Sequence, residues 1–581
     1  MWQIEGMYVA VIPNRGSPPA ILLRESYREG RKVRTRTLAN LSHWPPAQIE
    51  ALRRVLRGET LVAPEEAFEI VRSRPHGHVA AIVGTMRRLK LDELIARRPS
   101  RQRSLVLGMI AARLLAPASK LATARGFDPR TQHSTLGEVL GLGAASADDL
   151  YEALDWLVAR QGRVEAALAR RHLQEGALVL YDVTSVVYEG KTCPLVRWGH
   201  PRDGRRGKPQ LLVGVVTNGE GCPVAVEVFD GNTADPATLA PQISRVRQRF
   251  GLQRVVVVGD RGMLTEARLR EELAPAHLDW ITALRSPQVR QLVEAGALQL
   301  SLFDQRHLAE ITSPEYPGER LVVCRNPLLA AERARKREAL LAATEQELDR
   351  IAQATRRSHR PLRGREQIAL RVGRVLHRFK VGKHFRWEIT DQTFTYERDQ
   401  ARIAQEAALD GIYVIRTTVP AAALGAEEVV RAYKRLSTVE RAFRTLKSLD
   451  LLIRPIHHRL EERVRGHVLL CLLAYYVEWH MRQALAPLLF EDEDKKTAEA
   501  LRTSVVAPAQ RSPRARRKAQ TKQTDDGLPV HSFRTLLADL ATLTKNQVRS
   551  RAAGAVTVEM LATPTPVQQR AFDLLQVSPR L

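Results

Sequence analysis

One stretch of the chain, residues 177–284, alternates strand-like and helix-like segments in a fixed order, and this order constrains the fold more than any other feature. The expected strands are 177–189, 209–218, 222–228, 254–260 and 278–284. Helix-like segments at 236–250 and 264–274 separate the last three strands. The run RVVVVGD at 254–260 is rich in β-branched residues, as in strands covered on both faces. The stretch therefore predicts a sheet with helices packed on it.

Three meandering strands followed by helix, strand, helix and strand is the ribonuclease H-like order. We therefore expect a multidomain α/β protein whose ribonuclease H-like catalytic core is a mixed five-stranded sheet with helices, interrupted by an insertion and flanked by a helical N-terminal domain and a helical C-terminal part. The expected parts are a small β-rich segment (1–45), a helical DNA-binding domain (46–174), the first part of the core (175–285), an insertion made of a long helix and a β hairpin (286–405), the second part of the core with the catalytic helix (406–490) and a C-terminal tail (491–581). Within the tail, 507–528 is basic and almost free of large apolar residues, which predicts disorder.

The charge balance indicates a polyanionic partner. The 581 residues include 90 Lys plus Arg against 64 Asp plus Glu, a net charge of +26. Nucleic acid is the commonest partner of so basic a chain. An acidic membrane surface is the alternative, and it is less favoured because no lipidation motif or basic amphipathic anchor is present.

The N-terminus and the cysteines indicate a soluble intracellular protein. The first residues lack the basic and apolar regions of a signal peptide. The longest apolar run, Val468–Tyr476, is far shorter than the roughly 20 residues that span a bilayer. The cysteines have no metal-type spacing and are expected to be reduced thiols. No membrane association is expected.

Two aspartates occupy positions where a sheet gathers functional groups. Asp182 lies inside the first predicted strand, among Val179, Leu180 and Val183, where an isolated charge is costly. Asp260 ends the fourth. Each also has a structural interpretation: Asp182 as a paired buried charge, and Asp260 as a cap of the following helix. In the expected order these two strands are neighbours, so both carboxylates would face one site.

Two close carboxylates repel each other unless a cation lies between them. Oxygen ligands suit Mg²⁺, for which Mn²⁺ can substitute. A third acid is expected on the helix after the last strand, and Glu440 lies there. Tyr433, Glu440 and Lys447 are seven residues apart, close to two helical turns, and share one helix face. Such a polar stripe is commonly a solvated surface, but Val430, Val439, Phe443 and Leu446 supply a separate face for burial.

Five ordered motifs resemble those of the DDE transposases of bacterial insertion sequences, in the superfamily of insertion sequence four and its sixteen-thirty-four-like group. They are YDVTSVVYE around Asp182, VVVVGDRGMLTEARL around Asp260, YKRLSTVERAFRTLK around Glu440, the segment FDGNTADPATL and the loop GHPRDGRRGKPQ before the second strand. The resemblance is close over about 175–285 and 410–480.

The resemblance implies a transposase that cuts insertion-sequence ends and joins them to target DNA. Asp182, Asp260 and Glu440 would hold two Mg²⁺ ions, one activating a water or a DNA 3′-hydroxyl and the other steadying the leaving oxygen. The partners would be double-stranded DNA, as terminal inverted repeats and as target, and a second copy in a homodimer. The location would be the bacterial cytoplasm, associated with the nucleoid.

The resemblance also implies DNA-binding roles for several residues. Arg261, Tyr433 and Lys447 would hold phosphates or the strand being cut, although Arg261 is equally suited to an ion pair within the sheet. The family's usual Arg three residues after the Tyr is Leu436 here, so Arg435 or Lys434 would supply that charge. Family members can pass through a DNA hairpin, and Trp387 is the candidate for stacking a flipped base, with ordinary packing as the alternative.

Two other functions remain open at this stage. A ribonuclease H-like nuclease without strand transfer would not need so large an N-terminal part or insertion. A non-catalytic DNA-binding descendant would be expected to have lost at least one of the three acids, and all three are present. His457, His458 and His467 could suggest a metal cluster, but their Arg-rich surroundings favour a DNA-facing or structural role.

Overall fold

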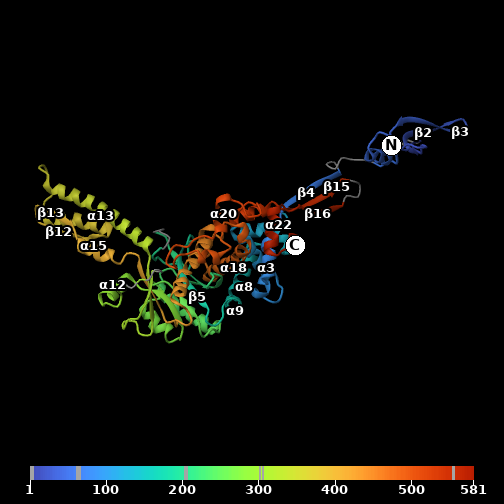
Figure 1. Ribbon diagram of the computed structural model, residues 1–581. Coiled ribbons are helices and arrows are strands. Elements are labelled where there is room, and N and C mark those ends of the chain that lie inside the picture. The colour runs from blue at the N-terminus through green and yellow to red at the C-terminus, as the bar shows by residue number, and fades with distance from the viewer. Residues whose placement is uncertain (1–5, 60–66, 202–206, 300–302, 304–306, 552–555) are drawn as a thin grey trace. The chain divides into compact units, whose positions relative to one another are not determined.

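The computed structural model describes residues 6–59, 67–201, 207–299, 303, 307–551 and 556–581. The chain divides into two compact units, each made from two stretches of sequence (Figure 1). Unit 1 is Met1–Arg74 with Thr544–Ala562, and unit 2 is Pro75–Leu543 with Thr563–Leu581. The middle of the predicted loop at 199–210, residues 202–206, lies outside the described residues.

Unit 1 contains two small antiparallel sheets. The first is formed by β1 (Met7–Ile12), β2 (Ala20–Glu29) and β3 (Lys32–Asn40), followed by the helix α1 (Pro46–Leu56). The second is formed by β4 (Phe68–Pro75), β15 (Thr544–Ser550) and β16 (Thr557–Leu561), in the order β16-β15-β4. The first sheet lies where the sequence predicts short strands. β4 was not expected, because its partner β15 comes from the other end of the chain and leaves no local pattern.

Unit 2 begins with short helices. They are α3 (Gly77–Arg88), α4 (Leu91–Ile95), α5 (Arg101–Leu115), α6 (Lys120–Phe127), α7 (Leu136–Val139), α8 (Ala147–Val158) and α9 (Gln161–His172). Side-chain caps fix several starts: the Ser146 hydroxyl accepts from the Asp149 amide at 3.0 Å, and the Asp149 carboxylate accepts from the Ser146 amide at 2.8 Å. Among the described residues no single helix has the length and apolarity to cross a membrane, although the bent pair α5 and α6 passes that test jointly.

The centre of unit 2 is an eight-stranded mixed sheet in the order β10-β11-β14-β9-β8-β5-β6-β7. Its strands are β5 (Leu178–Val187), β6 (Gln210–Asn218), β7 (Pro223–Asp230), β8 (Val256–Val258), β9 (Asp279–Ala283), β10 (Leu308–Ile311), β11 (Arg320–Arg325) and β14 (Ile412–Thr417). β5 pairs with β6 antiparallel and with β8 parallel, and β8 pairs with β9 parallel. The five strands from β5 to β9 have the predicted neighbours, but the prediction of a five-stranded sheet is wrong because β14, β11 and β10 extend it antiparallel.

Helices cover both faces of this sheet. β7 is followed by η1 (Asp235–Thr238), α10 (Leu239–Ser244) and the π-helical turn η2 (Arg245–Arg249). β8 is followed by α11 (Glu266–Arg268) and η3 (Leu269–Leu273), and β9 by α12 (Ser286–Glu294). The single long helix expected at 426–449 is divided into α16 (Ala426–Lys434), α17 (Leu436–Arg444) and the π-helical turn η5 (Thr445–Leu449). α16 packs on β9 and β14, and α17 packs on β5.

The insertion is a subdomain between β11 and β14. It contains α13 (Pro327–Arg356), α14 (Arg365–Phe379), η4 (Gly382–His384), β12 (Phe385–Ile389), β13 (Phe394–Arg398) and α15 (Gln400–Ala407). Its apolar residues, among them Leu348, Ile368 and Phe394, form a core of their own. The predicted long helix and hairpin are present. The predicted start at 286 is wrong, because α12, β10 and β11 pack with the main sheet and its core.

The C-terminal part is built around α18 (Glu461–Leu485), most of whose residues are buried. The remaining helices are η6 (Ala486–Leu488), α19 (Lys495–Ala500), α20 (Pro513–Thr521), α21 (Phe533–Ala541) and α22 (Pro566–Leu575). The prediction that 507–528 is disordered is wrong: Ser512 caps α20 and bonds Asp492, and Lys518 is buried against Glu493. Glu493 pairs with Arg514 and Lys518 of this basic segment, and composition alone does not reveal these contacts.

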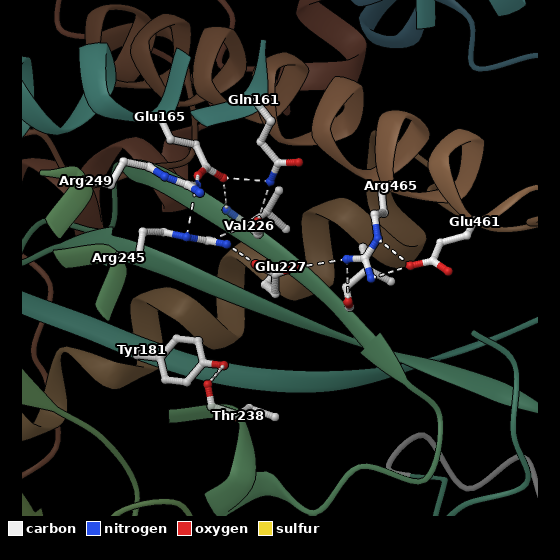
Figure 2. A network of polar contacts seen from close by, with 11 residues as sticks. Gln161, Glu165, Tyr181, Val226, Glu227, Thr238, Arg245, Arg249, Glu461 and Arg465 are labelled. Carbon is white, nitrogen blue, oxygen red and sulfur yellow. Dashed lines mark hydrogen bonds and ion pairs between the residues drawn. The ribbon is translucent and has the colours of Figure 1, made fainter. Parts of the chain in front are cut away.

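A buried ionic network ties α9 and α18 to β7 (Figure 2). The Glu165 side chain is fully buried and lies 2.9 Å from Arg249 and 3.6 Å from Arg245. Its Oε1 accepts from the Val226 amide of β7 at 3.1 Å. On the same strand Glu227 lies 2.9 Å from Arg465 of α18. Every charge in the network has a partner, as buried charges require.

Candidate functional site

Asp182 lies in β5, and Asp260 follows two residues after the end of the neighbouring parallel strand β8. Leu180 of β5 pairs with Val258 of β8, and each aspartate follows two residues later. Extending this register by two residues sets the aspartates side by side, at the roughly 4.8 Å spacing of adjacent strands. Asp182 is half-buried and Asp260 is exposed. The β5–β8 pairing therefore places the two acids near one edge of adjacent strands.

Hydrogen bonds fix both carboxylates. One oxygen of Asp182, Oδ1, accepts from the Val183 amide at 2.8 Å. Oδ1 of Asp260 accepts from the amides of Gly262 at 3.0 Å and Met263 at 2.8 Å. Asp260 therefore caps the turn after β8 and not the following helix, whose N-cap is Thr265, and both of these bonds use one oxygen only. A cap and a metal ligand are compatible on one carboxylate, because it has two oxygens.

Contacts near both ends of the helical segment 435–449 align it with β5. At the start, Gly219, which directly follows β6, lies between Arg435 and Leu178. A Cβ atom on Gly219 would be 3.2 Å from Arg435 Nη1 and 3.4 Å from Leu178 Cβ. Towards the other end, Lys447 Nζ donates to Thr184 Oγ1 at 2.5 Å. Thr184 shares a face of β5 with Asp182, since side chains alternate along a strand. The helix therefore runs along the Asp182 face of β5, in the direction of that strand.

This alignment sets Glu440 near Asp182. Glu440 lies about 7.5 Å beyond Arg435 along the helix, at ~1.5 Å per residue. Along β5, Leu180 and Asp182 lie about 7 and 13 Å beyond Leu178, at ~3.3 Å per residue. Glu440 is thus level with Leu180, about 5.5 Å before Asp182 along the strand, and its side chain is exposed. The carboxylate oxygens of the three acids do not all lie within 4.8 Å of one another. In the described part of the chain, one set of three potential metal ligands does meet this criterion, and it lies elsewhere.

Tyr433 lies close enough to Asp260 and Glu440 for both charges to act on its phenol. Burial raises the pKa of Tyr433 to about 12; the negative charges of Asp260 and Glu440 also raise it, and the positive charge of Arg261 lowers it. The phenol is consequently protonated at neutral pH and can donate a hydrogen bond to an anionic group. Tyr433, Asp260, Arg261 and Glu440 therefore share one electrostatic environment.

Lys447 and Arg261 flank the acids from two sides. Lys447 reaches β5 because the π-helical turn η5 widens the helix there, and such turns are frequent at functional sites. Arg261 is exposed and lines a cavity between α12 and the insertion. In the described parts of the chain Arg261 forms no ion pair, so nothing supports the ion-pair alternative considered for it.

The structure places Arg435 and Trp387 away from the acids. Arg435 lies 3.2 Å from Glu220 in the turn after β6, and its neighbour Lys434 donates to the carbonyl of Val506 at 3.2 Å. Neither takes the place of the arginine that Leu436 replaces. The Trp387 side chain is 47% exposed on β12 and pairs across the hairpin with Tyr396.

The position of Trp387 follows from the contacts of its partner. The Tyr396 hydroxyl donates to Asp349 at 2.6 Å. Asp349 lies about 18 Å along α13 from Arg337, at ~1.5 Å per residue, and Arg337 lines the cavity that contains Arg261. The indole is therefore exposed, as a stacking residue must be, but on a part of the insertion remote from Arg261.

Sequence reasoning missed a set of basic residues beside Arg261. The cavity that Arg261 lines is formed by the core and by the insertion, and its basic residues are Arg261, Arg290, Arg333, Lys336, Arg337, Lys380 and Lys383. Glu406 and Asp410 are its acidic residues. Composition reveals the excess of positive charge but not that α12, α13 and the segment before β12 concentrate it at one place.

The histidines considered as a metal cluster have structural contacts. His467 is buried, and its Nε2 donates to the Ile453 carbonyl at 3.0 Å. The His458 ring lies 5.2 Å from the His467 ring, and burial lowers the pKa of His458 to about 4. His457 contacts the Glu189 carbonyl at 3.1 Å. These contacts favour the structural role.

Comparison with known proteins gives two family matches. The family model described as "Transposase DDE domain" matches residues 174–477. The model described as "IS1634 family transposase, N-terminal domain" matches residues 10–67. No curated protein matches the chain.

One solved structure is similar in part. It is titled "Cryo-EM structure of piggyBac transposase synaptic complex with hairpin DNA", and it is 10% identical to this chain with a TM-score of 0.24. The match covers 43% of this chain and 55% of that one, so this chain spans about half the length of that protein.

Proposed function

Because this chain belongs to the family of transposases with a DDE domain, we propose that it cleaves DNA at the ends of an insertion sequence and transfers the ends into target DNA. The family implies binding to DNA and dependence on a divalent metal. We propose Asp182, Asp260 and Glu440 as the metal ligands and Mg²⁺, or Mn²⁺ in its place, as the ion. The observation that carries this proposal is the matching register of Asp182 and Asp260, with Glu440 on the helix along β5.

The donor set fits a hard divalent cation. All three side chains offer carboxylate oxygens, which Mg²⁺ and Mn²⁺ prefer. Asp182 lies in β5 between buried neighbours and is itself only half-buried, so its carboxylate remains accessible to a cation. When bound, the metal supplies Lewis acidity, which lowers the pKa of an attacking water or DNA 3′-hydroxyl and offsets charge at phosphorus.

The other residues bind and orient the DNA. Tyr433, as a protonated phenol beside Asp260 and Glu440, donates to an anionic oxygen of the scissile phosphate. Lys447, held by Thr184 on β5, adds positive charge on the opposite side of Glu440 from Tyr433. Arg261 and the basic cavity beside it bind the phosphates of the flanking strand, because Arg and Lys donate to phosphate oxygens.

We further propose a ribonuclease H-like core in β5 to β9, supported by their 3-2-1-4-5 order in chain sequence. The part at 46–174, in which the strand β4 interrupts the helices, would read the terminal inverted repeats, and pairing of two ends would require a homodimer. Arg435 and Trp387 are not assigned a role at the scissile phosphate.

We expect the purified chain with Mg²⁺ to nick or excise a labelled DNA end that carries the inverted repeat flanking its gene. The same reaction with added target DNA should give joined products, which separates a transposase from a nuclease without strand transfer. Chelation by EDTA should stop both steps, and Mn²⁺ should restore them. Binding without cleavage by the intact protein would exclude the enzymatic function and favour a DNA-binding descendant.

A further inference from the structure

Three potential metal ligands from distant parts of the chain meet at a second place in unit 2. His172 ends α9, Cys222 immediately precedes β7, and His480 lies in α18. One ligand atom from each lies within 4.8 Å of the other two, and the described residues contain no other such group of three. Cys222 is fully buried and both histidines are partly buried. The group is separate from Asp182, Asp260 and Glu440.

The hydrogen bonds leave donor atoms available in this group. His480 Nε2 is buried and has no hydrogen-bond partner among the described residues. A buried polar atom without a partner is uncommon in folded proteins and indicates a missing ligand or water. His172 Nε2 contacts the Tyr476 hydroxyl at 3.0 Å. The two imidazole rings are close, with centroids 5.6 Å apart.

The chemistry of the ligand set indicates zinc. One thiolate and two imidazoles are typical of Zn²⁺ sites, which also accept water in a fourth position. Mg²⁺ prefers oxygen ligands and would not compete here. Burial lowers the pKa of His172 and of His480 to about 4, so both rings are neutral at neutral pH, the form in which histidine ligates a metal.

Nearby positive charges work against a cation at this place. Arg171 lies close enough to act on His172 and Cys222, and Arg88 acts on His480. A bound Zn²⁺ displaces the thiol proton of Cys222 into solvent, and the resulting thiolate offsets one positive charge. Arg171 is also engaged elsewhere, since it donates to the carbonyl of Leu89 at 2.7 Å and to the Tyr476 hydroxyl at 3.2 Å.

We propose that His172, Cys222 and His480 bind one Zn²⁺ ion, with water in the fourth position, as a structural centre. The ion would join α9 and α18 to the turn between β6 and β7. Thr438 and Arg435, at the start of α17, contact Gly221 and Glu220 of that turn. The centre thus supports the end of the helix that carries Glu440. Zinc binding itself does not depend on the proposed transposase activity.

Metal content tests this proposal on the full chain. After purification without added chelator and dialysis against Mg²⁺, mass spectrometry should find one zinc per chain. Replacement of the zinc by Co²⁺ should give a thiolate-to-cobalt charge-transfer band. Cys222→Ser should lose that band and weaken Zn²⁺ binding by at least about 100-fold, since even residues behind the ligands contribute 10–100-fold.

Two controls separate this site from the rest of the protein. Cys324→Ser removes another buried thiol, on β11, and should keep zinc and the cobalt band. Asp182→Asn should keep both while it loses cleavage, so failure of the transposase proposal and failure of the zinc proposal give different results. A folded wild-type chain without zinc and without a cobalt–thiolate band would overturn the proposal, as would unchanged Zn²⁺ affinity in Cys222→Ser.

Discussion

Replacing Asp182 with Asn is expected to lower the rate of DNA end cleavage by at least about 1,000-fold, which corresponds to about 4 kcal/mol of lost transition-state stabilisation. Asn has nearly the same volume as Asp, and its amide oxygen can still accept the Val183 amide hydrogen. The substitution therefore removes the charge that holds the metal and leaves the strand intact. Affinity for the DNA end should change only a few-fold, because the basic cavity near Arg261 is untouched.

Cleavage of a labelled end under single-turnover conditions and a binding titration with the same DNA measure the two effects separately. Asp573→Asn is the matched control, since that side chain is exposed on α22 and accepts one hydrogen bond, from Gln569 at 2.8 Å. This control should cleave like the wild type. Equal loss of binding and cleavage in Asp182→Asn would mean that Asp182 supports the fold and not the chemistry.

Replacing Glu165 with Ala is expected to destabilise unit 2 by about 3–5 kcal/mol, the usual cost of removing one partner from a buried charge network. The substitution takes a side chain with no exposure away from Arg245 and Arg249 (Figure 2). Arg245 is itself buried and, among the described residues, keeps only Glu227 as an acidic partner, and the Val226 amide loses its acceptor. Each of these losses leaves a polar group unsatisfied away from water.

Urea unfolding followed by circular dichroism measures this effect as a lower midpoint for the transition of unit 2. The control is Glu347→Ala, which removes a surface ion pair with Arg350 and should cost less than about 1 kcal/mol. If both variants unfolded at the same urea concentration, the network in Figure 2 would not be a stabilising element.

The strands that carry the two aspartates could be predicted because their signals are local. β8 is a continuous apolar run and β5 is mostly apolar, and the chain order of strands and helices predicts β8 beside β5. The matching register of Asp182 and Asp260 then follows from a parallel pair. The added strands β10 and β11 could not be predicted, because they are short. In addition, β11 pairs with β14, which the insertion separates from it in the sequence.

The third acid and its neighbours were less predictable from spacing. Seven-residue steps place Tyr433, Glu440 and Lys447 on one face only if the helix is continuous. The helix is instead divided at Arg435 and widened at η5, so Arg435 turns to Glu220 and Lys447 reaches Thr184. These changes depend on packing against β5 and the turn after β6, which the periodicity does not contain.

Contacts between distant segments account for the remaining differences. The predicted disorder at 507–528 failed because acids at 491–494 pair with Ser512 and Lys518. The cysteines lack metal-type spacing in sequence, yet Cys222 meets His172 and His480 in space. Such groups come from three separate elements, so no short motif could have revealed them.

The central claim is that Asp182, Asp260 and Glu440 ligate one divalent metal centre, and replacement of each acid by Cys tests it most directly. A thiolate is a poor ligand for Mg²⁺ and a better one for Mn²⁺. We expect each of the three variants to be inactive in DNA end cleavage with Mg²⁺ and to regain part of the activity with Mn²⁺, while the wild type cleaves with either ion. Wild-type cleavage with Mg²⁺ by any one of the three Cys variants would contradict the assignment of that acid as a metal ligand.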